Sequence, residues 1–289
     1  MLSETQWQTA QNREGAASWR LINSGFQSAA ANMATDEAIM QAYAAKLVPP
    51  TIRFYGWQPA AVSIGYFQHG EREINFAACQ EQGIDVVRRL PGGRAVLHAK
   101  ELTYSTIVGE DYPDMPMTIT ASYRYLSRGL LLGLAKLGLT AEMTKPQAAY
   151  AHKIPQPASA ACFDAPSHYE LTVSQKKLIG SAQVRKHGVI LQHGSILLTF
   201  SAEQLAGILQ VGSEEKEQTC SMLKNRVMDL KTALGRNVAW DEARLAMEAG
   251  FAEALGIEPA VGELTAMEKK TAGELSVTKY AQDAWTLKR

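Results

Sequence analysis

The residues best suited to covalent chemistry in this chain lie within the segment 159–198. Cys162 stands among small residues directly before the turn sequence FDAPS, a setting that does not resemble that of a core-filling cysteine. Lys177 opens the later segment KLIGSAQVR. A nearby ammonium favours the thiolate over the thiol, and the thiolate is the nucleophilic form. We therefore interpret Cys162 as a nucleophile that Lys177 activates.

Two strands joined by a tight turn would bring this pair together. Tyr169, Leu171 and Val173 alternate with polar residues, which predicts a half-buried strand, and the polar SQK that follows predicts a turn. Lys177 would then return alongside the first strand, toward the loop that carries the cysteine. We expect Lys177 to point inward and Lys176 outward, although a slip of one residue in register would exchange them.

A second group of candidate residues lies in the segment 88–98, RRLPGGRAVLH. Glycines let backbone N–H groups approach a ligand closely, and arginines offer forked donors for carboxylate or phosphate. The segment would suit the polar part of a thioester substrate or a phosphate, but it would also suit an ordinary hairpin. Its candidate binding residues are Arg88, Arg89, Gly92, Gly93, Arg94 and His98. Dinucleotide-binding and P-loop glycine patterns are absent from the sequence.

Composition narrows the classes of function. Lys+Arg and Asp+Glu are equal at 29 each in 289 residues, so we expect no non-specific nucleic-acid binding. The polar start predicts no signal peptide, and no apolar run is long enough for a membrane span. The three cysteines lack CxxC spacing, which argues against a disulfide framework or a structural zinc site. We expect a cytoplasmic protein that uses no metal and no other cofactor.

Periodicity predicts an α+β fold with mixed, largely antiparallel sheets and flanking helices. We expect a catalytic domain over residues 19–200 and a helical C-terminal extension over 201–289 that packs on it. A helix is predicted from Ser28 to Lys46. The strands predicted at 51–57 and 61–67 would be joined by a hairpin or by another turn without a helix.

Several motifs in a fixed order carry a family resemblance. NMATDEAIM, TIRFYGWQPAAVSIGYFQ, RRLPGGRAVLH, CFDAPSHYELTVSQKKLIGSAQVR and LQHGSILL together resemble the biotin/lipoate A/B protein ligase superfamily, and within it the octanoyltransferases. The resemblance runs from Trp19 to Phe200, with a looser continuation to the C-terminus. It implies the catalytic fold of lipoate and biotin protein ligases.

The resemblance also implies an activity and a set of site residues. Members of this group move an octanoyl group from octanoyl-acyl carrier protein to a lysine of a lipoyl domain, such as the glycine cleavage H protein, through a cysteine thioester. By position, Cys162 would accept the acyl group and Lys177 would lower its pKa. The residues implied to line the acyl pocket are Gly92, Gly93, Arg94, His98, Gly180, Ser181 and Ala182, and His193 and Gly194 are implied to lie near it. Candidates for its apolar wall are Val96, Leu97 and Ile179.

Alternatives remain within and outside this family. ATP-dependent lipoate ligases typically carry a third glycine where this chain has Arg94, which disfavours adenylate binding. Relatives often have an acidic residue where Ala99 follows His98, so one polar contact would be missing. An octanoyl amidotransferase acting between lipoyl domains is a second alternative. A non-catalytic module that binds lipoyl domains or acyl carrier protein is a third, and both histidines of the predicted pocket could be purely structural.

Overall fold

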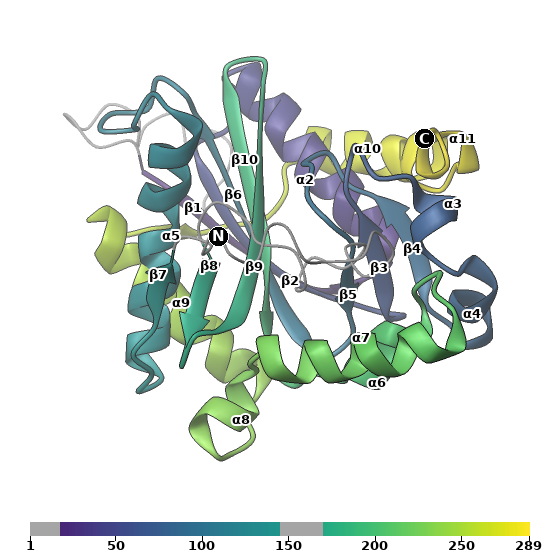
Figure 1. The fold of residues 1–289 in the computed structure, drawn as a ribbon. Coiled ribbons are helices and arrows are strands. Elements are labelled where there is room, and N and C mark those ends of the chain that lie inside the picture. The colour runs from purple at the N-terminus through teal and green to yellow at the C-terminus, as the bar shows by residue number, and fades with distance from the viewer. Residues whose placement is uncertain (1–17, 145–169) are drawn as a thin grey trace.

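The computed structural model describes residues 18–144 and 170–289, so the predictions for Cys162 and Tyr169 lie outside the described residues. The described chain forms an eight-stranded sheet and a three-stranded sheet flanked by helices (Figure 1). The large sheet has the order β11-β1-β2-β6-β10-β9-β8-β7, and the small sheet has the order β4-β3-β5.

The strands of the large sheet are β1 (Arg20–Gln27), β2 (Thr51–Trp57), β6 (Glu101–Gly109), β7 (Glu142–Thr144), β8 (Glu170–Val173), β9 (Lys176–Lys186), β10 (Val189–Leu197) and β11 (Ala260–Val261). Those of the small sheet are β3 (Ala61–Ile64), β4 (Asp85–Arg88) and β5 (Val96–His98). The helices are α2 (Ala29–Ala44), α3 (Gly70–Glu73), α4 (Phe76–Glu81), α5 (Ile119–Lys136), α6 (Ala202–Gly207), α7 (Ser213–Arg226), α8 (Leu230–Leu234), α9 (Trp240–Leu255), α10 (Ala266–Leu275), the π-helical η3 (Ser276–Tyr280) and α11 (Asp283–Thr286).

Strand directions confirm the predicted mixed, largely antiparallel α+β fold. Strand β1 runs parallel to β2 and β11, and β3 runs parallel to β4, whereas the other pairs are antiparallel. Of the two connections expected between β2 and β3, the turn without a helix is confirmed, whereas the two strands do not pair as a hairpin. Both edges of β2 are already paired, with β1 and β6, so the chain turns at residues 58–60 and β3 starts the second sheet.

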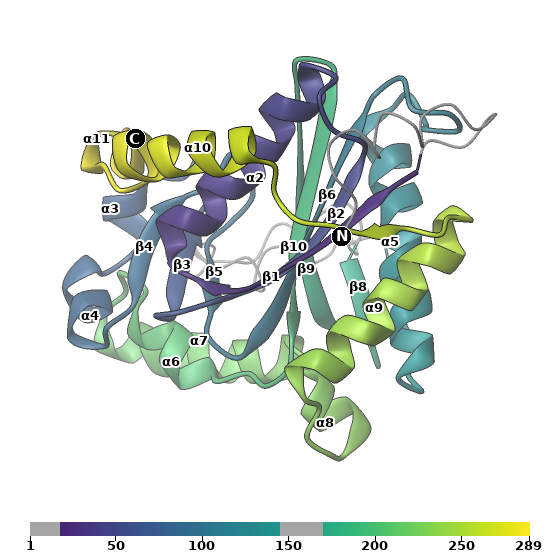
Figure 2. The ribbon, with the colours of Figure 1, turned by 180° about the vertical axis from the view of Figure 1, so that it is seen from behind.

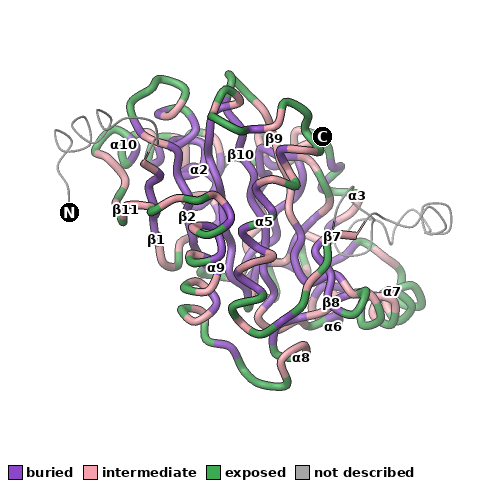
Figure 3. The backbone as a smooth tube through the Cα atoms, turned by 90° about the vertical axis from the view of Figure 1, so that its left-hand side faces the viewer, coloured by how far each residue is buried: buried purple, intermediate pink, exposed green. Residues whose placement is uncertain are grey.

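Alternating side chains of the large sheet face two different helical layers. On one face, Phe54 packs with Leu130 of α5 and Phe251 of α9 in the largest core cluster. On the other face, Tyr55 packs with Met33 of α2. Figures 1 and 2 show α5 with α9 at one side of the molecule and α2 with α10 at another. Buried backbone runs through the strands between these helices, as Figure 3 shows.

Helix α2 is the element that places polar groups inside the fold. The Ser28 hydroxyl caps its first turn by accepting from the Ala31 N–H at 3.4 Å, as expected for an N-cap serine. The helix is covered by the sheet on one side and by α10 and η3 on the other (Figure 2). Because of this double cover, even Asp36 and Glu37 are buried.

The segment after residue 200 is helical except for β11, which adds to the edge of the large sheet beside β1. A buried ion pair also ties it to that strand, because Arg20 Nη2 lies 2.6 Å from Glu268 Oε1. The division of the chain into domains at residue 200 stays a prediction. In the described part of the chain, no helix has both the length and the apolar character that a membrane crossing requires.

The hairpin predicted before Lys177 is confirmed. Ser174 and Gln175 have φ of 50° and 61°, the left-handed pair that a two-residue hairpin turn needs. Strand β8 ends at Val173 and β9 begins at Lys176, so Thr172 stands opposite Lys177.

Candidate active site

A pocket with an empty volume of about 330 Å³, including its mouth, lies between the two sheets. The large sheet contributes Tyr55, Trp57, Thr103, Gly180, Ser181, Ala182, His193, Gly194 and Ser195; the small sheet and its flanks contribute Ser63, Arg89, Val96 and His98; and α2 contributes Met33.

Sheet register explains why residues distant in sequence meet here. Arg53 stands opposite Ser105, Ser105 opposite His193, and His193 opposite Ala182, across β2, β6, β10 and β9. Directly opposed residues of neighbouring strands share one face of the sheet. One row of side chains therefore leads from beneath α2 to the pocket.

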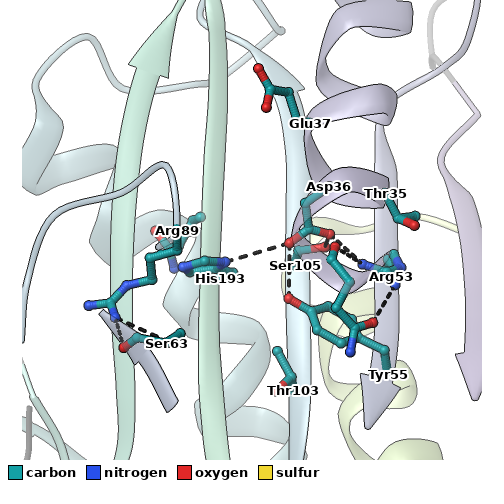
Figure 4. A network of polar contacts seen from close by, with 12 residues as sticks. Thr35, Asp36, Glu37, Arg53, Tyr55, Ser63, Arg89, Thr103, Ser105 and His193 are labelled. Atoms are coloured by element: carbon teal, nitrogen blue, oxygen red, sulfur yellow. Dashed lines mark hydrogen bonds and ion pairs between the residues drawn. The ribbon is translucent and has the colours of Figure 1, made fainter. Parts of the chain in front are cut away.

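Asp36 of α2 is the centre of a buried polar network on this row (Figure 4). Its carboxylate accepts from Arg53 Nη1 at 2.7 Å, from the Tyr55 hydroxyl at 2.9 Å and from the Ser105 hydroxyl at 2.9 Å. Nδ1 of His193 lies 3.5 Å from the same carboxylate. The carboxylate and guanidinium are a buried ion pair whose remaining polar atoms are largely satisfied, as such a pair requires.

The contacts of this network determine whether Asp36 and His193 are charged. Burial alone would raise the pKa of Asp36, but Arg53 and the contact with His193 outweigh it, so this pKa lies below its ordinary value. Burial lowers the pKa of His193, and Arg89 adds to that effect, although Asp36 opposes it. Near neutral pH the pocket therefore presents a neutral imidazole that is backed by an ionised carboxylate.

A second histidine is held in a similar way on the opposite wall. The Nε2 of His98 lies 2.8 Å from the Ser63 hydroxyl, and its Nδ1 lies 3.4 Å from Glu101 Oε1. Its ring stacks on Trp57 with centroids 4.0 Å apart. Burial lowers the pKa of His98 despite the opposing effect of Glu101. This imidazole is also neutral near pH 7, so it can pack as an aromatic surface in the pocket wall.

Arg89 links the pocket to the glycine turn. Its Nη1 donates to the Ser63 carbonyl at 2.6 Å, and its Nη2 donates to the carbonyls of Gly92 and Arg94 at 2.9 and 2.7 Å. Gly93 has φ of 89°, and a Cβ placed there would lie 3.9 Å from that of Ala182. Arg89 therefore shapes the Gly92–Gly93 turn against β9, while lining the pocket itself.

The predicted binding residues divide into two groups. Those that line the pocket are Arg89, His98, Gly180, Ser181, Ala182, His193 and Gly194. Those that lie outside its lining are Arg88, Gly92, Gly93 and Arg94. Arg88 points away because strand neighbours alternate, and its guanidinium donates to backbone carbonyls, including those of Gly65 and Thr286. The side chain of Arg94 is 39% exposed and lies 3.5 Å from Glu73.

Lys177 is buried on β9, three residues before the pocket segment that starts at Gly180. Its Nζ lies 2.9 Å from Glu170 Oε1 on β8. Its neighbour Lys176 is partly exposed and donates to the Lys224 carbonyl at 3.1 Å. The sequence thus identified the buried lysine of the pair, but gave no sign that Glu170 is its counter-ion.

Sequence reasoning missed the polar floor of the pocket, which comprises Asp36, Arg53, Tyr55, Ser105 and Ser195. The sequence did contain one indication of this buried polar network. Arg53 stands in the otherwise apolar strand TIRFYGW, every residue of which is buried. A buried arginine needs a carboxylate partner, and Asp36 is an acidic residue of the adjacent predicted helix. For the wall candidates, Val96 lines the pocket, whereas Leu97 and Ile179 pack in core clusters instead.

Comparison with known proteins agrees with this geometry. Residues 28–252 match the lipoyl protein ligase A/B catalytic domain. Proteins named octanoyltransferase LipM from Kyrpidia tusciae and Bacillus subtilis are 47% and 45% identical to this chain, over 94% of it and over 99% and 98% of their own lengths.

Solved structures show the same fold. A bipartite lipoate protein ligase from Thermoplasma acidophilum is 26% identical with a TM-score of 0.77, covering 94% of this chain and 97% of its own. A lipoate-protein ligase A bound with ATP is 28% identical with a TM-score of 0.75, covering 93% of this chain and 98% of its own. With a family match over most of its length, the chain belongs to the lipoyl protein ligase A/B catalytic domain family.

Proposed function

We propose that this chain is an octanoyltransferase of lipoate biosynthesis that takes octanoyl from octanoyl-acyl carrier protein, holds it on Cys162 as a thioester, and passes it to a lysine of a lipoyl domain. The observation that carries the proposal is 41–47% identity, over 94% of this chain, to proteins named octanoyltransferase LipM. The glycine cleavage H protein is the acceptor we would test first. The cysteine content suits a reducing cytoplasm, where we place the activity.

The first half-reaction is a thioester exchange. The Cys162 thiolate attacks the acyl carbonyl, the carrier's thiolate leaves and takes up a proton, and the octanoyl group remains on the cysteine as a thioester. Lys177 is the proposed cation that favours the thiolate, and its burial beside Glu170 supports a fixed position for its charge. The exchange replaces one thioester by another, so it needs no ATP.

The second half-reaction forms the amide. The acceptor lysine amine attacks the acyl-enzyme, loses a proton, and releases the Cys162 thiolate. Lys177, when neutral, is the proposed base for that proton. Backbone N–H groups at 180–182 are the proposed oxyanion donors. Among the described residues, β9 pairs with β8 only as far as Ile179. Residues 180–182 therefore have no neighbouring strand on the edge that faces away from β10.

The pocket is proposed to hold the acyl chain. Met33, Trp57 and Val96 supply apolar surface, and the neutral imidazoles of His98 and His193 avoid placing charge against a hydrocarbon. Each buried methylene of the chain is worth about 0.8 kcal/mol. Apart from the guanidinium of Arg89, which donates to backbone carbonyls, the lining is uncharged, which supports an aliphatic acyl group as its occupant.

Incubation of the protein with octanoyl-acyl carrier protein, followed by intact mass measurement, tests the proposal. We expect one octanoyl adduct that a lipoylatable domain then removes. An ATP-dependent lipoate ligase, the activity named for the solved relatives, would instead need ATP, magnesium and free acid. An amidotransferase would accept octanoyl from a lipoyl domain but not from the carrier protein. An adduct that forms only with ATP and free octanoate would overturn the proposal.

A further inference from the structure

Cations gather on aromatic rings at the C-terminal end of the chain, beside α3 and β4 (Figure 1). Nζ of Lys288 lies 3.5 Å from the ring centroids of both Tyr66 and Trp285. The guanidinium carbon of Arg289 lies 5.2 Å from the centroid of Phe67, whose side chain is 65% exposed. Cation–π contacts of this kind hold charged groups in place without neutralising them.

The positive charge of this cluster is not compensated locally. Among the described residues, no aspartate or glutamate forms an ion pair with Lys288 or Arg289. Burial lowers the pKa of Lys288 to about 8, and the neighbouring charges of Arg88, Lys279, Arg289 and Lys186 add to that effect. Glu37, the nearby acid on α2, is already bonded to Lys279 at 2.6 Å. An anion placed here would relieve repulsion among the cations.

The glycine turn contacts the cluster on one side and the candidate pocket on the other. A Cβ at Gly92 would lie 3.4 Å from the ring of Phe67, on the cluster's side. A Cβ at Gly93 would lie 3.9 Å from that of Ala182, which lines the pocket. Arg88 holds the Tyr66 loop to the C-terminal segment by donating to the carbonyls of Tyr66 and Thr286. A flexible ligand that reaches the pocket across this turn would pass both cations.

We propose that Lys288 and Arg289, held on Tyr66, Phe67 and Trp285, form an anion site for the phosphate of the pantetheine arm that delivers the octanoyl thioester. The proposal rests on the function proposed above. Acyl carrier protein and coenzyme A both present a fatty acyl thioester on such a phosphate-bearing arm, so the recognised chemistry is common to the two donors. The phosphate binds at the rim, and the acyl chain enters the pocket beyond the Gly92–Gly93 turn.

The test measures acyl-enzyme formation by the complete protein from octanoyl-phosphopantetheine and from octanoyl-pantetheine, which lacks the phosphate. In the wild type we expect the phosphate to raise kcat/KM by about tenfold or more, the effect of one or two charge-assisted hydrogen bonds. In the K288Q/R289Q double variant the two substrates should react equally. The matched control K269Q/K270Q removes two exposed charges from α10 and should keep the full preference.

Octanoyl-coenzyme A and octanoyl-acyl carrier protein complete the comparison, and both should lose activity in the double variant. If the variant slows only the carrier-protein donor, the cluster binds the protein surface and the phosphate site is refuted. If the wild type shows no preference for the substrate that carries the phosphate, the inference is also refuted. This outcome is measured on the wild type alone, so it does not depend on whether a variant folds. If no thioester donor acylates the wild type, the proposed function itself is wrong.

Discussion

Oδ2 of Asp36 lies 3.5 Å from Nδ1 of His193, which joins the central helix α2 to a strand that lines the pocket. The same carboxylate accepts from Arg53 at 2.7 Å and is almost completely buried. The candidate pocket therefore lies against a buried ion pair in which Asp36 and Arg53 neutralise each other. Directional bonds thus fix this wall of the pocket.

We predict that Asp36→Asn destabilises the protein strongly. The substitution leaves the buried guanidinium of Arg53 without its counter-charge, which typically costs about 3–5 kcal/mol. Urea unfolding should show a lower midpoint with an unchanged slope. Asp241→Asn is the matched control, because it breaks an ion pair whose carboxylate is 71% exposed and should change stability by less than about 1 kcal/mol. Equal midpoints for the two variants would refute the role of the floor.

We predict that stability falls as pH drops below about 6.5, the ordinary pKa of histidine. The pKa values of His98 and His193 are lowered in the fold, mainly by burial, so the unfolded chain binds these protons first. Stability is then lost as pH falls, by at most about 1.4 kcal/mol per pH unit for each histidine. Asp36, with its lowered pKa, adds a separate loss only below about pH 4.

Unfolding free energies measured between pH 7.5 and 5 check this dependence. The H98N/H193N variant should show a flatter profile, whereas H187N, which alters an exposed turn residue, should keep the wild-type slope. A wild-type profile that is flat over this interval would show that the two imidazoles are not held neutral.

We predict that Lys177→Gln slows formation of the acyl-enzyme by about 100-fold or more near pH 7, the usual scale for losing a positioned acid–base group. The rate should recover as pH rises, because the cysteine then ionises without help from the cation. Lys176→Gln changes the neighbouring, partly exposed lysine and should leave the rate almost unaltered. Measuring the pH–rate profile separates loss of activation from misfolding, since a misfolded variant would not regain activity at high pH.

We predict that Gly194→Ala destabilises β10, one of the strands that line the pocket. An added Cβ would collide with the Gly180 carbonyl at 2.7 Å and with the ring of Tyr104 at 2.8 Å, besides the Ser181 hydroxyl. Overpacking of this kind typically costs about 1–3 kcal/mol. Gly273→Ala, on helix α10 with nothing near its Cβ position, should be neutral or slightly stabilising. Thermal unfolding and octanoyl transfer, compared for the two variants, check the prediction.

The sequence was most informative where local pattern decides structure. Alternation predicted the strand at 170–173, the polar turn predicted the hairpin, and the register then placed Lys177 inside. Motif order predicted the fold, and four residues that it implied for the pocket, His98 and Gly180–Ala182, do lie in the lining, whereas Gly92, Gly93 and Arg94 do not. These features depend on residues that are adjacent in the sequence or that occur together in one family motif.

Features set by long-range packing were not predicted. Asp36 and His193 are far apart in the chain, and they meet because β2, β6 and β10 align in one register beneath α2. Arg88 and Arg89 look equivalent in sequence, yet strand alternation sends one to backbone carbonyls and the other to the pocket. The sequence left open whether β2 and β3 pair as a hairpin or are joined by a simple turn, and the turn forms because β2 has partners on both edges, one of them from later in the chain.

Intact mass after mixing with octanoyl-acyl carrier protein tests the central claim most directly, using Cys162→Ala beside Cys79→Ala. Cys79 is buried on α4, where burial raises its thiol pKa to about 11, so it should not react. We predict one octanoyl adduct on the wild type and on Cys79→Ala, and none on Cys162→Ala. A Cys162→Ala protein that still becomes octanoylated and transfers the group at the wild-type rate would contradict the account.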